Sequence, residues 1–351
     1  MNTAELFLQR EVESLSPYAF LTRNTKGRLK VAADDARGEY RTDFQRDRDR
    51  IIHCKSFRRL MHKTQVFFSP ADEHYRTRMT HTLEVAQISR IIARALRLNE
   101  DLTEAIAMGH DLGHTPFGHE GEMAMRHCFD STFAHYEQSL RVVDLLERDG
   151  AGLNLTYEVR DGILNHSGQN QAVTLEGRIV KIADRIAYLN SDIDDAIRAG
   201  ILLPEDIPCE LSAVLGDGYS TRINAMVRNV IESSFEQPDI CMTGEVEEAT
   251  LELRDFLMKN VYRGSAAKRD EGKAQYLLIR LFEYFRDHPE EMPPLYVRNI
   301  SRDGVARCVC DFISGMTDRY AIERYEELFI PRVWRGNSVR RVAESADLTL
   351  I

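Results

Sequence analysis

The sequence has 351 residues, six cysteines and a formal net charge of −10. An acidic chain of this kind is a poor general ligand for nucleic acid, because broad binding to phosphates depends on positive charge that releases counterions. The cysteines form no CxxC pair, which argues against a disulfide framework and against a zinc ribbon. The length predicts one large domain, or a domain with a helical extension.

The first residues, Met1-Asn2-Thr3-Ala4-Glu5, are not a basic segment followed by an apolar run, so we expect no secretory signal. No stretch approaches the roughly 20 apolar residues that a transmembrane helix needs. We therefore expect a cytoplasmic protein in a reducing environment, with no membrane partner.

Hydrophobic residues at helical spacing predict a chain built from helices. Residues 5–15 are expected to form the first, which Ser16-Pro17 ends, and residues 22–38 to be irregular or a short hairpin. Small residues in the helix expected at 102–111 would let it approach its neighbours closely. The other predicted helices are 80–98, 122–148, 175–199, 221–233, 245–260, 267–287 and 303–328. The predicted fold class is all-α.

The segment from Arg41 to Lys63 is the one clearly basic region, with eight Lys or Arg side chains against three Asp. Two interpretations are open. The segment is either a solvated helix face on which Arg and Asp form pairs, or a surface that faces phosphate or nucleic acid. A phosphate site nearby would favour the second.

The densest polar stretch is HDLGHTPFGHEGE, from His110 to Glu122, which holds three histidines in thirteen residues. His110 and Asp111 together offer a neutral nitrogen and an anionic oxygen, a mixed set that suits Mg, Mn, Fe, Ni or Zn. The Gly and Pro residues that follow break the helix, so the later histidines lie on a turn that can fold back toward an ion. Two residues do not complete a metal site, and further ligands are needed.

Two other helices offer those ligands. His81 lies in the first turn of the helix predicted at 80–98. Asp184, Tyr188 and Asp192 recur every four residues on one face of the helix predicted at 175–199. That face is either an acidic stripe in solvent, or Asp184 is the missing ligand and its neighbours face a substrate. His127 is expected to be structural or exposed, and His166 to end a helix.

The ordered set His81, His110-Asp111 and Asp184 resembles the HD superfamily of metal-dependent phosphohydrolases. Further segments resemble the bacterial deoxyguanosine triphosphate triphosphohydrolase family, and the resemblance extends from about residue 37 to 330. These segments are RTDFQRDRDR (41–50), FRRL (57–60), KTQVF (63–67), RMTHTLEVA (78–86), the stretch that begins at His110, and GMTDR (315–319).

The resemblance implies an HD-domain helical core at 41–203, preceded by an N-terminal arm at 1–40 and followed by a C-terminal helical region at 204–351 that packs on the core. It also implies an activity: removal of the intact triphosphate from a deoxynucleoside triphosphate by water attack at the α-phosphorus. The expected cofactor is a divalent ion, first Mg²⁺ or Mn²⁺, then Fe, Ni, Co or Zn. The implied metal ligands are His81, His110, Asp111 and Asp184.

The same resemblance assigns the remaining site residues. It gives proton transfer to His119, oriented by Glu122, while His114 and His135 contact the phosphates. The i, i+3 spacing of His119 and Glu122 fits a carboxylate that holds one ring tautomer. Arg78 and Arg185 are expected to neutralise the triphosphate. The residues expected around the deoxyribose are Gln65, Tyr188 and Asp192.

The implied partners are deoxynucleoside triphosphates as substrate, an activating nucleotide, and further copies of the chain in a tetramer or hexamer. An HD phosphohydrolase for another nucleotide is a related alternative. A different class is a nucleotide sensor or single-stranded-DNA-binding regulator. It would use the basic segment 41–63 and a basic tail that contains Arg332, Arg335, Arg340 and Arg341.

Overall fold

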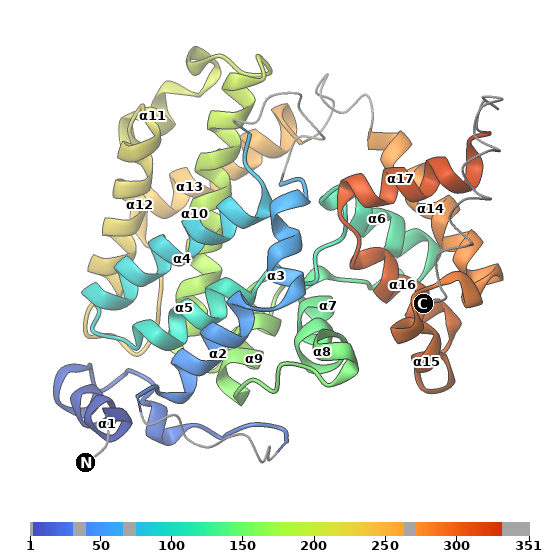
Figure 1. Ribbon diagram of the computed structural model, residues 1–351. Coiled ribbons are helices and arrows are strands. Elements are labelled where there is room, and N and C mark those ends of the chain that lie inside the picture. Colours follow the sequence, from blue (N-terminus) through green and yellow to red (C-terminus); the bar gives the residue numbers. More distant parts are fainter. Residues whose placement is uncertain (1–2, 31–39, 66–74, 263–270, 332–351) are drawn as a thin grey trace, which may run out of the picture.

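The computed structural model describes residues 3–30, 40–65, 75–262 and 271–331, and this part of the chain is helical (Figure 1). Its only β pairing is two isolated bridges, Arg28 with Thr156 and Thr64 with Thr77. The predicted all-α fold is confirmed. None of the described helices is long and apolar enough to cross a membrane.

The first half of the chain forms α1 (Thr3–Ser14), α2 (Asp43–Ile52), α3 (Lys55–Arg59), α4 (Arg78–Ala95), α5 (Glu100–Gly109), α6 (His119–Cys128), α7 (His135–Arg141), α8 (Glu147–Gly150) and α9 (Tyr157–Asn165). The second half forms α10 (Leu175–Arg198), α11 (Cys209–Leu215), α12 (Tyr219–Ser234), α13 (Gly244–Asn260), α14 (Glu271–Asp287), α15 (Pro294–Asp303), α16 (Val305–Ser314) and α17 (Asp318–Phe329).

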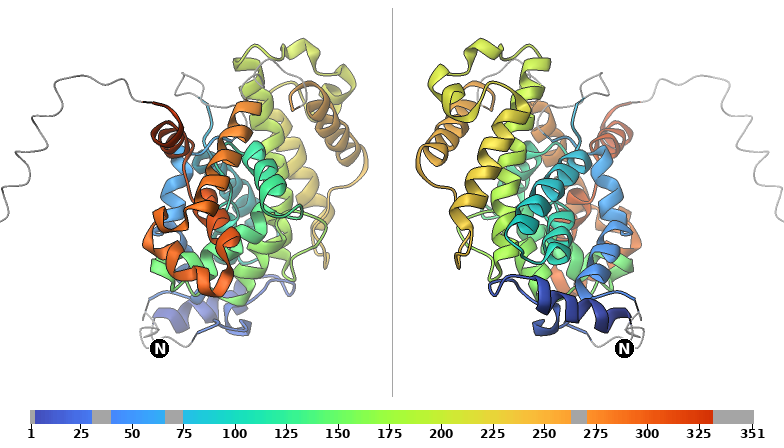
Figure 2. Two further views of the ribbon diagram at one scale, coloured as in Figure 1. Left: turned by 90° about the vertical axis from the view of Figure 1, so that its right-hand side faces the viewer. Right: turned by 90° about the vertical axis from the view of Figure 1, so that its left-hand side faces the viewer.

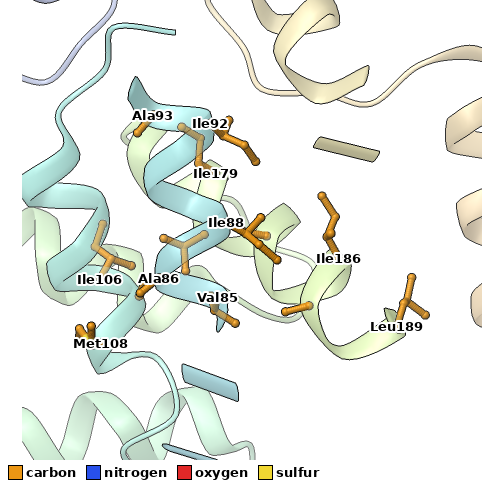
Figure 3. Close-up of a cluster of buried hydrophobic side chains, with 14 of the residues drawn as sticks. Val85, Ala86, Ile88, Ile92, Ala93, Ile106, Met108, Ile179, Ile186 and Leu189 are labelled. Atoms are coloured by element: carbon orange, nitrogen blue, oxygen red, sulfur yellow. The ribbon is translucent and has the colours of Figure 1, made fainter. Parts of the chain in front are cut away.

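The larger hydrophobic cluster joins α4, α5 and α10 (Figure 3). Ile88, Ile106 and Ile186 come from these three helices, and each is at most 2% exposed. Such burial contributes roughly 1.5–3 kcal/mol per side chain. Gly109 allows the close approach predicted for this region, because a Cβ there would lie 2.6 Å from Ile163 of α9. Helices α11 to α13 pack on the same cluster.

The smaller hydrophobic cluster is formed by α6, α14, α16 and α17. Met125 of α6 and Leu281 of α14 are fully buried there, and α14 lies beside α6 in Figures 1 and 2. Phe117, which precedes α6, also belongs to this cluster. The C-terminal helices therefore pack directly against the end of the histidine-rich stretch.

Two predicted helices are interrupted. The helix predicted at 122–148 breaks after α6, where the Asp130 side chain accepts hydrogen bonds from the backbone and the hydroxyl of Thr132. This local bonding competes with the helical ladder. The chain resumes as α7, a short π-helical segment and α8. The helix predicted at 303–328 breaks at Gly315, and Thr317 then caps α17 by accepting from Tyr320. The prediction of continuous helices was wrong at both places.

Several charged side chains of the basic segment 41–63 form ion pairs, both within the segment and with other helices. Arg41 forms an ion pair with Asp49 at 2.6 Å, and Arg48 forms one with Glu104 at 3.0 Å. These contacts agree with the interpretation as a helix face with paired charges. The tail that begins at Arg332, part of the 22–38 segment and the start of the helix predicted at 267 lie outside the described residues.

Candidate active site

Three helices bring the four predicted metal ligands together. Thr77 caps α4 and so places His81 in its first turn, while α5 ends at His110. His81 Nε2 lies 3.0 Å from Asp184 Oδ1 on α10, and His110 Nε2 lies 3.9 Å from the same oxygen. Ligand atoms of His81, His110 and Asp111 all lie within 4.8 Å of one another. This spacing suits atoms that share one cation.

The hydrogen bonding of His110 fixes its tautomer. Its Nδ1 lies 2.7 Å from the backbone oxygen of Ala107, so Nδ1 carries the proton and Nε2 presents a lone pair. The ring is 1% exposed, and Nε2 has no hydrogen-bond partner within the described residues. A buried nitrogen without a partner is costly. A bound cation would satisfy it, so the residues fit a metal.

The two carboxylates are held in their charged form. Burial opposes ionisation of Asp184, but its hydrogen bond to His81 and the neighbouring imidazoles lower its pKa to about 2. Burial also opposes ionisation of Asp111, but the Arg78 guanidinium and the neighbouring imidazoles together outweigh it and hold the pKa of that carboxyl well below its usual range. Both oxygens are therefore ready to bind a cation.

Arg78 places a buried positive charge beside the ligands. Its Nη1 donates to Asp111 Oδ2 at 2.6 Å, and its side chain is 6% exposed. Its other terminal nitrogen lies close to Gly118, where a Cβ would come within 3.4 Å of it. Arg78 thus lies between the ligand set and the turn that follows, as an anion-binding cation would.

A second group of polar side chains adjoins the ligands. The rings of His114 and His135 stack with centroids 4.7 Å apart, and both residues have ligand atoms near Asp111. Glu122 Oε2 lies 3.5 Å from His135 Nδ1, and Glu122 Oε1 accepts from Arg126 at 3.0 Å. Burial opposes both charges of the His135–Glu122 pair, yet the pairing raises the pKa of His135 and lowers that of Glu122.

The expected orientation of His119 by Glu122 is not what these contacts show. Glu122 pairs with His135 and Arg126, while His119 is exposed at the start of α6. The reason is the break after α6, which folds α7 back so that His135 meets the first turn of α6. The i, i+3 spacing alone could not anticipate a partner thirteen residues away.

His166 is a site residue that the sequence interpretation missed. It ends α9, as expected, but it is 1% exposed and its Nε2 lies 3.2 Å from His135 Nε2. Its ring centroid is 5.0 Å from that of His110. Burial and the neighbouring histidines lower its pKa to about 3, so the ring is neutral. Nothing in its local sequence signals this position.

Of the residues expected around the sugar, Tyr188 and Asp192 lie on α10, while the backbone oxygen of Gln65 would lie 3.3 Å from a Cβ at Gly118. Asp192 is 2% exposed and accepts a hydrogen bond from the Tyr262 hydroxyl, a residue not anticipated from the sequence. Gln65 has a buried side-chain oxygen with no partner in the described part of the chain. Arg185 instead lines a hollow of about 280 Å³, together with Arg178 and Lys181.

Asp192 makes stability depend on pH. Burial raises its pKa to about 7, so in the folded chain it holds a proton that the unfolded chain releases above about pH 4. The free energy of unfolding that this group contributes falls as the pH rises from about 4 to 7, by about 1.4 kcal/mol per pH unit at most.

We expect Asp192→Asn to become more stable relative to the wild type as the pH rises from about 4 to 7, as measured by denaturant unfolding. The exposed Asp255→Asn on α13 is the control, and an equal gain there would contradict the assignment.

Comparison with family models identifies two regions. The model described as HD domain matches residues 78–189, which contain all four expected metal ligands. The model described as Phosphohydrolase-associated domain matches residues 240–327, from just before α13 into α17.

Comparison with curated proteins gives relatives over nearly the full length. A deoxyguanosinetriphosphate triphosphohydrolase-like protein of Caldanaerobacter subterraneus is 57% identical over 95% of this chain and 98% of its own. A protein of the same name from Desulfatibacillum aliphaticivorans is 48% identical over 94% of this chain and 99% of its own. Among solved structures, a phosphohydrolase of Bacteroides thetaiotaomicron aligns with a TM-score of 0.50 at 18% identity, over 79% of this chain and 66% of that one.

Proposed function

This chain belongs to the deoxyguanosinetriphosphate triphosphohydrolase-like family of HD phosphohydrolases, and we propose that it hydrolyses deoxynucleoside triphosphates to a deoxynucleoside and tripolyphosphate. The observation that supports this most is the convergence of His81, His110 and Asp111 at ligand spacing, with the Arg78 cation beside them. A site that joins a cation-binding set to a buried guanidinium suits a phosphate ester.

The donor set has two imidazoles and two carboxylates, which suit Mg²⁺, Mn²⁺ or another divalent ion. When bound, such an ion would polarise a phosphate oxygen and lower the pKa of a water molecule. His81, His110, Asp111 and Asp184 would hold it. Asp111 would have a second function, because its other oxygen orients Arg78.

Side chains of the protein would bind the triphosphate and transfer a proton to the leaving group. Arg78 places positive charge next to the ligand set, and pairing with Glu122 raises the pKa of His135 beside it. We propose that His119 gives a proton to the departing 5′ oxygen, which is a poor leaving group unless protonated. Its exposure leaves it free to turn toward a bound substrate. Tyr188, Asp192 and Gln65 would surround the deoxyribose.

Product analysis tests the proposed reaction. The protein is loaded with Mn²⁺ or Mg²⁺ and incubated with each of the four deoxynucleoside triphosphates, alone and in pairs so that an activating nucleotide is present. We expect a deoxynucleoside and intact tripolyphosphate. Monophosphate with pyrophosphate, or no turnover under any combination, would reject the proposal.

Metal removal should abolish activity and lower stability together. Chelation leaves His110 Nε2 buried without a partner and two adjacent carboxylates ionised. Adding Mn²⁺ at about 100 times its Kd should restore turnover and raise the free energy of unfolding by about 2.7 kcal/mol. Titration calorimetry gives the Kd for the metal, a turnover assay measures the first effect, and denaturant unfolding measures the second. A chelated protein that keeps full activity would contradict the metal site.

The substitution Asp111→Ala distinguishes an enzyme from a regulator. If the protein is a phosphohydrolase, this variant should lose turnover. If it is a nucleotide sensor or a DNA-binding regulator, the variant should still bind its partner. Salt-dependent binding of single-stranded DNA by this variant would support the regulator. We also propose a cytoplasmic homo-oligomer, a tetramer or hexamer, which light scattering of the purified protein tests.

A further inference from the structure

The turn between Asp111 and α6 has an unfavourable backbone. Phe117 has φ +60°, which is uncommon for a residue with a side chain, and Gly118 follows with φ +60° and ψ −128°. For a residue other than glycine, such as Phe117, this conformation costs of order 1–3 kcal/mol and persists only where the surroundings enforce it. The turn bears His114 and leads into His119, so whatever enforces its shape also places these two side chains.

Asp318, at the start of α17, makes the contacts that fix the turn. Its Oδ1 accepts from the backbone nitrogen of Phe117 at 2.9 Å. Its Oδ2 accepts from the backbone nitrogen of Thr64 at 2.8 Å and from the Thr64 hydroxyl. The carboxylate is largely buried, which makes each hydrogen bond to it stronger than one in water. The Asp318 side chain thus joins the turn at Phe117 to the segment that contains Thr64.

The buried side chain of Lys63 also joins the turn to the C-terminal helices. Lys63 Nζ donates to the backbone oxygen of His114 and, at 2.8 Å, to that of Ser314 at the end of α16. The Phe117 side chain is 4% exposed and packs in the smaller cluster with residues of α14, α16 and α17. The C-terminal helices therefore hold the turn directly, through the backbone and the side chain of Phe117, and indirectly, through Lys63, which joins His114 to Ser314.

We propose that Asp318 is a positioning residue, which holds the turn from Gly113 to Gly118 in the conformation that places His114 and His119 for reaction. Its effect on catalysis rests on the proposed function. Asp318 touches no expected metal ligand in the described residues, so the metal site should form without it. The C-terminal helices are then part of the active site rather than only a covering layer.

The test compares Asp318→Asn with a chemically matched control. An Asn side chain has one oxygen, so either Phe117 or Thr64 would face an amide NH₂. Asp47→Asn makes a comparable change elsewhere: Asp47 is fully buried, and its Oδ2 accepts from the backbone and hydroxyl of Thr156, both at 2.7 Å. Its Oδ1 also forms an ion pair with Arg28, so this control removes at least as much local bonding as Asp318→Asn does. Asp47 contacts none of the expected site residues in the described structure. Asp318→Glu keeps the carboxylate and serves as a rescue variant.

Two measurements are made on each full-length variant: amide hydrogen exchange of a peptide spanning 112–119, and steady-state kinetics with bound metal quantified. For Asp318→Asn we expect faster exchange in this peptide, unchanged metal content, and a kcat reduced about 10- to 100-fold, since a displacement of about 1 Å can cost that much. Asp318→Glu should recover part of both effects. Asp47→Asn should alter neither, even if it lowers global stability.

Unchanged exchange in the 112–119 peptide, or a kcat that falls no more than in Asp47→Asn, would overturn the positioning role. Loss of metal from Asp318→Asn would overturn it too. If the wild type hydrolyses no deoxynucleoside triphosphate, the proposed function fails, and the exchange comparison by itself decides whether Asp318 holds the turn.

Discussion

Replacing Asp184 by Asn should abolish hydrolysis, with a loss of about 1,000-fold or more. The substitution keeps the shape of the side chain and a hydrogen bond to His81, but it removes one of the two negative charges that face the expected cation. Loss of that charge weakens metal binding and with it the activation of water, an effect that accounts for several kcal/mol of the barrier. Turnover of each deoxynucleoside triphosphate and metal content per chain are the two measurements.

Asp194→Asn is the matched control on the same helix. Asp194 lies on the solvent side of α10, with a 38% exposed side chain that forms an ion pair with Arg76 at 2.9 Å. We expect its turnover and metal content to match those of the wild type. Comparable activity in Asp184→Asn and Asp194→Asn would show that α10 supplies no ligand.

Gly113→Ala should have the largest effect on folding. A Cβ at this position would lie 2.1 Å from the backbone nitrogen of Ser139 and 2.3 Å from the carbonyl carbon of Gln138, at the centre of α7. Backbone atoms cannot move aside as a flexible side chain can, so α7 must shift away from the turn. We expect a stability loss of about 3 kcal/mol. Hydrolysis should fall as well, since the shift would separate His135 from His114.

Gly272→Ala is the control for this change. Gly272 lies in α14 with no atom within 4 Å of an added Cβ, so alanine there should stabilise the helix slightly, by about 1 kcal/mol at most. Denaturant unfolding of both variants measures the difference. A Gly113→Ala protein with wild-type stability would mean that the close approach of α7 to the turn is not required.

Much of the fold could be predicted because helical periodicity is local. The helices at 80–98, 102–111 and 175–199 correspond to α4, α5 and α10, whose apolar faces form the larger cluster. The predicted helices at 122–148 and 303–328 are interrupted by local interactions that the hydrophobic pattern does not reveal. At Asp130 the side chain bonds to the nearby backbone, and at Thr317 the side chain caps a new helix. The predicted boundary near residue 203 stays a prediction.

The candidate site was also predicted only in part from the sequence. The sequence by itself determined the kinds of ligand, since two histidines and two aspartates define the chemistry of a cation site wherever they meet. Only the tertiary structure decided the neighbours of those ligands. Glu122 pairs with His135, His166 enters the histidine cluster, and Asp318 reaches a turn 201 residues away. Such contacts depend on where helices break and how they pack, and no spacing along the chain encodes them.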